Sequence, residues 1–245
     1  MEYYCITDVG LIRDKNQDSY IALENAYGDF LVLVADGIGG GKAGEVASGE
    51  VIKYFDFTFR QSGKFTAIED VINFLTFHVN AVNKHVYEMS TKYEEYEGMG
   101  TTLTGFLITK LGTVIVNCGD SRVYGFKDEM MIQLTNDHTL INKLLQEGKI
   151  TYEESLNHPQ RHYLIKAIGV GEKVKADIKE IKDMDYLLAC SDGLHGYISD
   201  EEIKNIVLDK EKSVAQKTID LKDLSLLKGG YDNVTAVLLK VKEDV

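Results

Sequence analysis

Short apolar runs that end in an aspartate constrain the fold of this chain more than any other feature of its sequence. The runs are FLVLVADG, TVIVNCGD and DYLLACSDG, and their aspartates are Asp36, Asp120 and Asp192. Their length and their content of β-branched and aliphatic residues are typical of β-strands. In a sheet protein, carboxylates at strand ends can converge although they are distant in sequence. We therefore expect a β-sheet core with acidic side chains at the ends of its strands.

The periodicity of the whole chain predicts a layered α+β fold. Strands are predicted at residues 30–35, 102–109, 113–117, 122–126, 186–189 and 234–241. Helical spacing of apolar residues predicts helices at 45–59 and 68–91, with shorter helices at 140–147, 200–207 and 213–222. Several strands follow one another as hairpins and do not alternate strictly with helices. This order favours two packed sheets with flanking helices over a doubly wound sheet.

We expect residues 1–245 to form one domain. A chain of 245 residues lies within the range of a single domain, and 44% of its residues are hydrophobic, enough for a full core. It has one proline, Pro159, and no linker-like, low-complexity or repeated segment divides it. Residues 136–171 are polar and partly helical, and we interpret them as an excursion over the surface. Excursions of this length are often functional.

The charge of the chain argues against two classes of partner. The 39 acidic and 27 basic residues give a formal net charge of −12, the wrong sign for attraction to nucleic acid or to an anionic membrane. We therefore expect no nucleic-acid partner. A phosphate-bearing substrate would need local positive charge, from a metal ion or from a well-placed arginine.

The cysteines and the N-terminus predict a cytoplasmic protein without membrane insertion. Cys5, Cys118 and Cys190 are odd in number and have neither disulfide-like nor metal-like spacing, as expected in a reducing compartment. We expect them to be small, buried hydrophobic side chains. The first residues, MEYYCITDVG, lack the pattern of a secretory signal, and no apolar run is long enough to cross a bilayer.

Two further aspartates have settings comparable with the first three, Asp18 in RDKNQDSY and Asp232 in GGYDNVTAVLL. Clustered carboxylates repel one another, and their burial without compensation raises their pKa values or destabilises the site. Hard divalent cations are the usual compensation, and an all-oxygen ligand set favours magnesium or manganese over zinc or copper. Two such ions could share a bridging water and lower its pKa from about 15.7 toward about 7, for in-line attack on phosphorus.

A simpler interpretation exists for each aspartate taken alone, because an Asp-Gly pair after a strand usually marks only a turn. Five aspartates in matching contexts are harder to explain as turns. Periodicity cannot establish that the five side chains meet in space, so the metal site is a hypothesis at this point.

Eight blocks of the sequence resemble, in the same order, those of the metal-dependent type 2C protein phosphatases, the PPM family, and most closely its compact bacterial members. The blocks cover nearly the whole chain: TDVGLIRDKNQDSY, VADGIGGGKAGEVAS, GMGTTLTGFLI, VNCGDSRVYGF, LTNDHTLINKLLQEGKI, HPQRHYLIKAIG, LLACSDGLHGYISDEEI and GGYDNVTAVLL. The resemblance implies a four-layer αββα sandwich, in which two antiparallel sheets are flanked by helices and a metal cleft lies at one end. Residues 136–171 would be the flap beside that cleft.

The resemblance also implies a metal centre with two core ions, Mn²⁺ or Mg²⁺. Asp36 would bridge both ions, the Gly37 carbonyl would bind one of them, and Asp192 and Asp232 would complete the other. Bacterial members hold a third ion, to which Asp120 and Asp192 would contribute. The implied activity is hydrolysis of phosphoserine and phosphothreonine on proteins, by attack of a hydroxide that bridges the metals.

Two more roles follow from the resemblance. Asp18 would orient metal-bound water from outside the ligand set, and Arg13 would hold the phosphoryl oxygens through charge-assisted hydrogen bonds, which suit a fork-shaped guanidinium. The chain departs from eukaryotic members at Ile38, where they have a histidine credited with protonating the leaving group. That role cannot be carried over. His138 and His162 could replace it, although a surface or structural role is the more usual one for such histidines.

Two other departures remove no essential ligand. Gln17 stands where many eukaryotic members have an acidic residue, and Tyr231 stands where a small residue is common.

A nucleotide-binding loop is the first rival interpretation, since Gly39, Gly41 and Gly44 fit GxGxxG directly after a predicted strand. Asp36 would place a carboxylate at the mouth of that loop, and no acid-capped second strand follows at the required distance. A Walker loop fails as well, because Asp36 occupies its first glycine position and Ala43 its hydroxyl position.

Two further alternatives stay within the resemblance: a catalytically impaired relative that only binds phosphoproteins, and a phosphatase of a small phosphate ester. The first would be expected to lack metal-binding aspartates, which are all present here. The expected partners are phosphorylated proteins and an opposing Ser/Thr protein kinase, the latter by family analogy alone. We expect a monomer.

Overall fold

The computed structural model describes residues 1–38, 43–156 and 158–241. The strands are β1 (Glu2–Asp8), β2 (Asp18–Glu24), β3 (Phe30–Ile38), β4 (Gly100–Thr101), β5 (Leu103–Thr109), β6 (Gly112–Cys118), β7 (Arg122–Lys127), β8 (Met130–Gln133), β9 (Asp177–Ile181), β10 (Tyr186–Cys190) and β11 (Val234–Lys240). The helices are α1 (Gly44–Arg60), α2 (Ile68–Lys92), α3 (Leu140–Gln146), α4 (Tyr152–Leu156), α5 (Asp192–His195), α6 (Asp200–Val207) and α7 (Val214–Leu227), with a 3₁₀ turn at Glu94–Tyr96.

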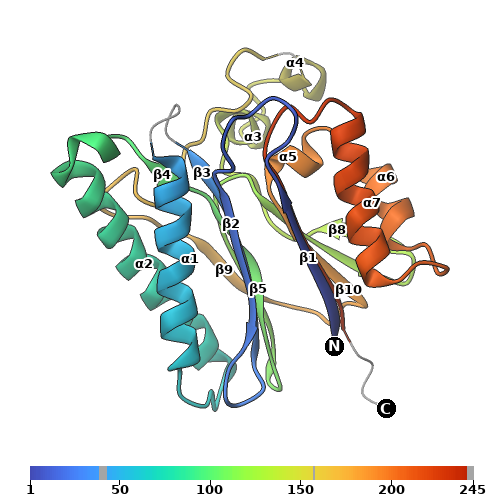
Figure 1. Ribbon diagram of the computed structural model, residues 1–245, viewed down its shortest axis with the longest axis horizontal. Coiled ribbons are helices and arrows are strands. Elements are labelled where there is room, and N and C mark those ends of the chain that lie inside the picture. The colour runs from blue at the N-terminus through green and yellow to red at the C-terminus, as the bar shows by residue number, and fades with distance from the viewer. Residues whose placement is uncertain (39–42, 157, 242–245) are drawn as a thin grey trace.

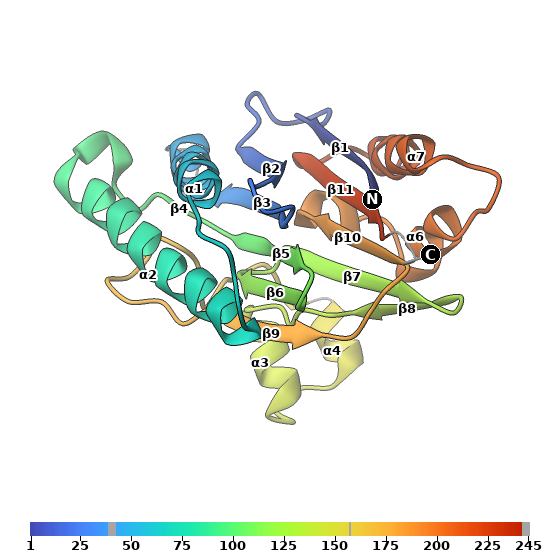
Figure 2. The same cartoon turned by 90° about the horizontal axis from the view of Figure 1, so that it is seen from below.

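The strands form two antiparallel sheets. One has the order β1-β11-β10-β7-β8 and the other β2-β3-β5-β6-β9, with the short β4 paired to the end of β3. In Figure 1, α1 and α2 cover the outer face of the second sheet and α5, α6 and α7 cover the outer face of the first. Figure 2 shows the same four layers from below. The expected α+β arrangement of two antiparallel sheets between helices is therefore confirmed.

Strand β3 shows why a nearly continuous apolar run is needed at the centre of such a fold. Successive side chains of a strand point to opposite faces of its sheet. Leu31 and Leu33 pack toward α1 and α2, whereas Val32 and Val34 pack against the facing sheet. Both faces of this strand are thus buried, and a polar residue anywhere in its middle would lose its hydration.

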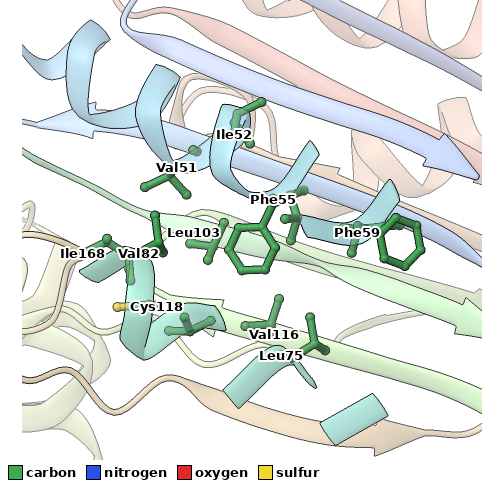
Figure 3. Close-up of a cluster of buried hydrophobic side chains, with 14 of the residues drawn as sticks. Val51, Ile52, Phe55, Phe59, Leu75, Val82, Leu103, Val116, Cys118 and Ile168 are labelled. Atoms are coloured by element: carbon green, nitrogen blue, oxygen red, sulfur yellow. The ribbon is translucent and has the colours of Figure 1, made fainter. Parts of the chain in front are cut away.

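The outer core beneath α1 and α2 follows from the helical spacing of their apolar residues. Val51, Phe55 and Phe59 lie on one face of α1 and are fully buried, as is Leu75 on α2. Figure 3 shows these rings and aliphatic groups between the two helices and the strands beneath them, close to Val116. The predicted apolar stripe of α2, from Val71 to Val86, is buried throughout.

The predicted strands and helices are all present, with boundaries shifted by a few residues; α7 runs further than expected, to Leu227. The prediction missed β1, β2, β8, β9, the two-residue β4 and the short α4 and α5. Apart from β4, the missed strands carry exposed polar residues; β9, for example, reads DIKEI at the edge of its sheet. Cys118 and Cys190 are buried as expected, whereas Cys5 is only half-buried.

Residues 136–171 carry α3 and α4, which lie beyond one end of the two sheets, at the top of Figure 1. Two isolated β-bridges hold this segment, Thr139 with Leu164 and Thr101 with Ile168. The second bridge ties its C-terminal end directly to β4, next to the end of β3. Within the described ranges, no helix is both long and apolar enough to cross a membrane.

Candidate metal centre and phosphate-binding site

The five aspartates singled out in the sequence lie at the same end of the two sheets. Asp18 begins β2 and pairs in register with Asp36 on β3. Asp120 follows the end of β6, Asp192 follows the end of β10, and Asp232 precedes β11. Because β10 and β11 are antiparallel neighbours, the end of one and the start of the other lie together.

Electrostatics show that these carboxyl groups face one another. Burial raises the pKa of Asp36 well above its ordinary value, and four neighbouring carboxylates raise it further: Asp18, Asp192, Asp120 and Asp232. The carboxyl groups of Asp36 and Asp192 share a hydrogen bond. The structure therefore brings together all five predicted acidic side chains.

Asp18 is the most enclosed member of the set. It is 8% exposed, and its Oδ2 accepts a hydrogen bond of 2.7 Å from Ser191 Oγ. Its Oδ1 has no hydrogen-bond partner among the described atoms. Burial is the main cause that raises the pKa of Asp18 to about 7. A buried carboxylate oxygen without a partner costs free energy unless a cation or a donor lies beside it.

Arg13 lies on the loop between β1 and β2, where its Nη2 donates to Asp232 Oδ2 at 2.8 Å. The guanidinium is half-exposed, so it can also reach an incoming ligand. This hydrogen bond is the main cause of its raised pKa. The predicted phosphate-binding arginine is thus adjacent to the acidic cluster, and here its partner is a carboxylate.

The loop that carries Arg13 is fixed by Asn233, which sequence reasoning did not single out. Asn233 Nδ2 donates to the carbonyl oxygens of Val9 and Lys15, and its Oδ1 accepts from the backbone N–H of Gln17. The buried amide of Asn233 therefore ties the loop that carries Arg13 to the segment that carries Asp232. The only sequence signal was its position beside that aspartate.

Thr101 in β4 and Thr102, between β4 and β5, hold the end of β3 in place. Thr102 Oγ1 accepts from the backbone N–H of Asp36, and Thr101 Oγ1 donates to the Asp36 carbonyl. Gly37 needs the absence of a side chain, because a Cβ there would lie 2.2 Å from the Gly44 carbonyl oxygen. The backbone around the candidate ligands Asp36 and Gly37 is thereby fixed on both sides.

Two histidines hold the turn that carries Asp120. His138 Nδ1 accepts from the backbone N–H of Gly119, and His195 Nε2 donates to the Asp120 carbonyl at 3.0 Å. Burial is the main cause that raises the pKa of Asp120 to about 8, followed by repulsion from Asp192. Sequence reasoning missed His195, although its place three residues after Asp192 in DGLH was a usable signal.

The contacts of His138 and His162 do not identify either histidine as the acid that protonates the leaving group. His138 is buried, and its Nε2 lies 3.2 Å from both Lys166 Nζ and Asp177 Oδ2. It therefore has the structural role. His162 is exposed, accepts from Arg161 Nε at 2.8 Å, and is close enough to Asp192 to lower the pKa of that carboxyl, whose main perturbation is a rise caused by burial.

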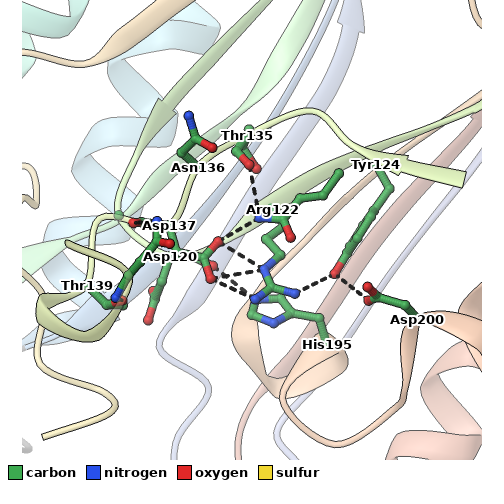
Figure 4. Close-up of polar contacts among 12 residues, drawn as sticks. Asp120, Arg122, Tyr124, Thr135, Asn136, Asp137, Thr139, His195 and Asp200 are labelled. Carbon is green, nitrogen blue, oxygen red and sulfur yellow. Dashed lines mark hydrogen bonds and ion pairs between the residues drawn. The ribbon is translucent and has the colours of Figure 1, made fainter. Parts of the chain in front are cut away.

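A partly buried ion pair joins this turn to the start of the flap segment (Figure 4). Arg122 donates from Nε and Nη2 to the carboxylate of Asp137, at 3.0 and 2.7 Å, and from Nη1 to Tyr124 Oη. Tyr124 Oη donates in turn to Asp200 at the start of α6. Bidentate guanidinium pairs fix orientation as well as distance. These contacts therefore hold β7 against Asp137, which precedes His138, and against the start of α6.

The fit of divalent cations to this site can be tested on the side chains themselves. In the part of the chain that the structure describes, no three His, Cys, Asp or Glu side chains are arranged to hold an ion as they stand. The unpartnered Oδ1 of buried Asp18 and the mutual repulsion of five carboxyl groups nevertheless fit added positive charge. All the side-chain donors are oxygens, which suits Mg²⁺ or Mn²⁺.

Comparison with known proteins agrees with this geometry. A family model described as protein phosphatase 2C matches residues 13–223. The chain belongs to the protein phosphatase 2C family. The resemblance read from the sequence is thereby confirmed, and the nucleotide-loop alternatives fail; of their glycines, Gly39 and Gly41 lie outside the described residues.

Relatives of this family member have similar length and the same fold. The serine/threonine phosphatase stp of Listeria welshimeri is 35% identical over 240 residues, covering 96% of this chain and 93% of the relative. Protein phosphatase PhpP of Streptococcus pneumoniae is 33% identical, covering 100% and 99%. The solved structure of serine/threonine phosphatase Stp1 from Staphylococcus aureus has a TM-score of 0.92 and 36% identity, covering 99% of this chain and 95% of that one.

Proposed function

We propose that this protein hydrolyses phosphoserine and phosphothreonine esters of proteins, with Mn²⁺ or Mg²⁺ as cofactor. The observation that carries the proposal is the convergence of five aspartates from separate segments, with an arginine beside them, at one end of the sandwich. Family membership supports the reaction class. The names of the relatives, which are serine/threonine phosphatases, support the substrate class.

The proposed ligands of two core ions are Asp36, the Gly37 carbonyl, Asp192 and Asp232, with Asp120 and Asp192 for a third ion. Bound there, the ions would supply an acidified water and would neutralise charge on the phosphoryl group. Asp18 would accept a hydrogen bond from that water through its free Oδ1. Its other oxygen is already held by Ser191, so the carboxylate is fixed in orientation.

Arg13 would exchange partners when substrate binds. In the structure its guanidinium pairs with Asp232, one of the proposed ligands. If Asp232 held a cation, the guanidinium of Arg13 would be free to donate to two phosphoryl oxygens. Bidentate, charge-assisted hydrogen bonds are the strong ones, so Arg13 would contribute mainly to phosphate binding.

Replacing Arg13 by Ala should therefore raise KM for a phosphothreonine peptide roughly tenfold, with a smaller fall in kcat, because one charge-assisted contact is lost. Steady-state kinetics at saturating Mn²⁺ measure both constants. Arg60→Ala is the matched control, since Arg60 pairs with Asp56 on the surface of α1. An unchanged KM in Arg13→Ala would remove Arg13 from the phosphate site.

The proposed activity is tested by hydrolysis of a phosphothreonine peptide with added Mn²⁺, after chelation, and after Mn²⁺ is restored. We expect turnover to vanish with the chelator and to return with the metal. Activity that persists in chelator would contradict the metal dependence. Parallel assays with small phosphate esters address the alternative substrate class, and an inactive protein that still binds phosphopeptide would support the impaired regulator.

The remaining proposals concern the setting of the enzyme. We propose a single catalytic domain over residues 1–245 with a flap at 136–171, acting as a monomer in the cytoplasm. An opposing Ser/Thr protein kinase is the proposed source of its substrates. The cysteine pattern supports the cytoplasmic location, and membership of the family supports the domain, the flap, the monomer and the opposing kinase.

A further inference from the structure

A groove of about 930 Å³ lies beside the acidic site. Its walls come from both halves of the chain: Ile38 and Gly98 on one side, and residues 162–167, 170–171 and 173–175 on the other. Val170 and Tyr163 are mostly exposed along it. Its size is near the upper end for a small-molecule pocket, and its apolar stretches suit the side chains of an extended peptide.

The groove is basic in a protein whose net charge is −12. Lys166, Lys173 and Lys175 line it, and the described lining contains no acidic residue. Lys166 Nζ lies 3.3 Å from Asp177. Lys173 and Lys175 are exposed, and neither forms an ion pair within the described residues. Two unpaired ammonium groups on one wall are therefore available to an anionic ligand.

The groove and the candidate site share neighbouring segments of the chain. Ile38 follows Asp36 by two residues on β3, and its side chain forms part of the groove wall. His162 also lines the groove and acts electrostatically on Asp192. These two links place the groove next to the segment that would carry a bound phosphorylated residue.

The wall that carries the two lysines is fixed before any ligand arrives. Asn83 on α2 is buried; its Nδ2 donates to the carbonyl oxygens of Gly171 and Glu172, and its Oδ1 accepts from the backbone N–H of Gly169. Rigid walls reduce the entropy lost on binding, so the groove is suited to selecting a ligand.

We propose that this basic groove binds the substrate segment that flanks the phosphorylated residue, and that Lys173 and Lys175 select an acidic or second phosphorylated side chain there. The inference rests on the proposed protein phosphatase activity and adds the substrate class. Net negative charge repels acidic substrates elsewhere on the molecule, so this wall gives a local preference.

The test uses phosphothreonine peptides in a neutral scaffold, with glutamate or a second phosphothreonine placed at each neighbouring position in turn. For wild-type enzyme we expect kcat/KM to rise roughly fivefold to tenfold at one or two positions, and the gain to shrink at high salt. In Lys173→Ala/Lys175→Ala the gain should disappear. The control Lys64→Ala/Lys110→Ala removes two exposed, unpaired lysines elsewhere and should retain it.

Charge reversal separates recognition from folding. Lys173→Glu/Lys175→Glu should favour peptides with lysine at the same positions, which damage to the fold cannot produce. No acidic preference at any position, or the same preference in wild type and in the alanine double variant, would overturn the proposal. Hydrolysis of an aryl phosphate, which has no flanking residues, is measured in parallel, so failure of the catalytic proposal itself would be seen separately.

Discussion

Asp36→Asn should lower phosphatase turnover to below about a hundredth of the wild-type rate, even at saturating Mn²⁺. Loss of residues that only support metal ligands typically costs 10–100-fold in activity or affinity, so loss of the proposed bridging ligand should cost at least about that much. The fold should survive, because the change removes one of five mutually repelling carboxylates. Circular dichroism and phosphopeptide kinetics on the same sample measure both effects.

Asp29→Asn is the matched control. Asp29 is also buried, at 6% exposure, but it lies in the turn between β2 and β3, at the other end of those strands. Its turnover per folded molecule should stay near wild type. If Asp36→Asn kept more than about a tenth of the wild-type rate, the proposed ligand set would have to be replaced by another.

Asp18→Asn should stabilise the metal-free protein at pH 8 and have little effect at pH 4. Burial raises the pKa of Asp18 from 3.8 to about 7. Below about pH 4 the group is protonated in both states. As the pH rises toward 7, the unfolded chain releases this proton and the folded chain keeps it, so the stability contribution falls and is lost above about pH 7. Asparagine does not titrate, so the variant does not lose stability in this way as the pH rises.

The stability difference between Asp18→Asn and wild type should therefore grow with pH to about 2–4 kcal/mol, since each pKa unit corresponds to about 1.4 kcal/mol. For a chain of this size that is a difference in Tm of roughly 5–15 °C. Thermal unfolding in chelator at several pH values measures it. Added Mn²⁺ should reverse the order, because ligand binding stabilises the folded wild type. A difference independent of pH would contradict a raised pKa at Asp18.

Local sequence was sufficient to determine most of the framework. Buried strands such as β3 can be recognised in the sequence because both of their faces are covered, which requires a nearly continuous apolar run. Helices α1 and α2 can be recognised in the sequence because their buried apolar residues recur once per helical turn. Asp36, Asp120 and Asp192 were found for the same reason, since each ends an apolar run. Asp18 and Asp232, by contrast, stand at or just before the start of a strand. The edge strands β1 and β9 were not predicted, because their exposed faces permit polar residues and so interrupt the apolar pattern.

Tertiary structure alone decided how these pieces meet. That Asp18 faces Asp36 depends on strand register, and that Arg13 meets Asp232 depends on a loop held by Asn233. The basic groove joins Ile38 to lysines more than a hundred residues later. Side-chain bonds to backbone carbonyls and contacts between distant segments leave no periodic trace in sequence. They arise only when packing of the two sheets fixes which strand ends are neighbours, and that long-range choice created the site.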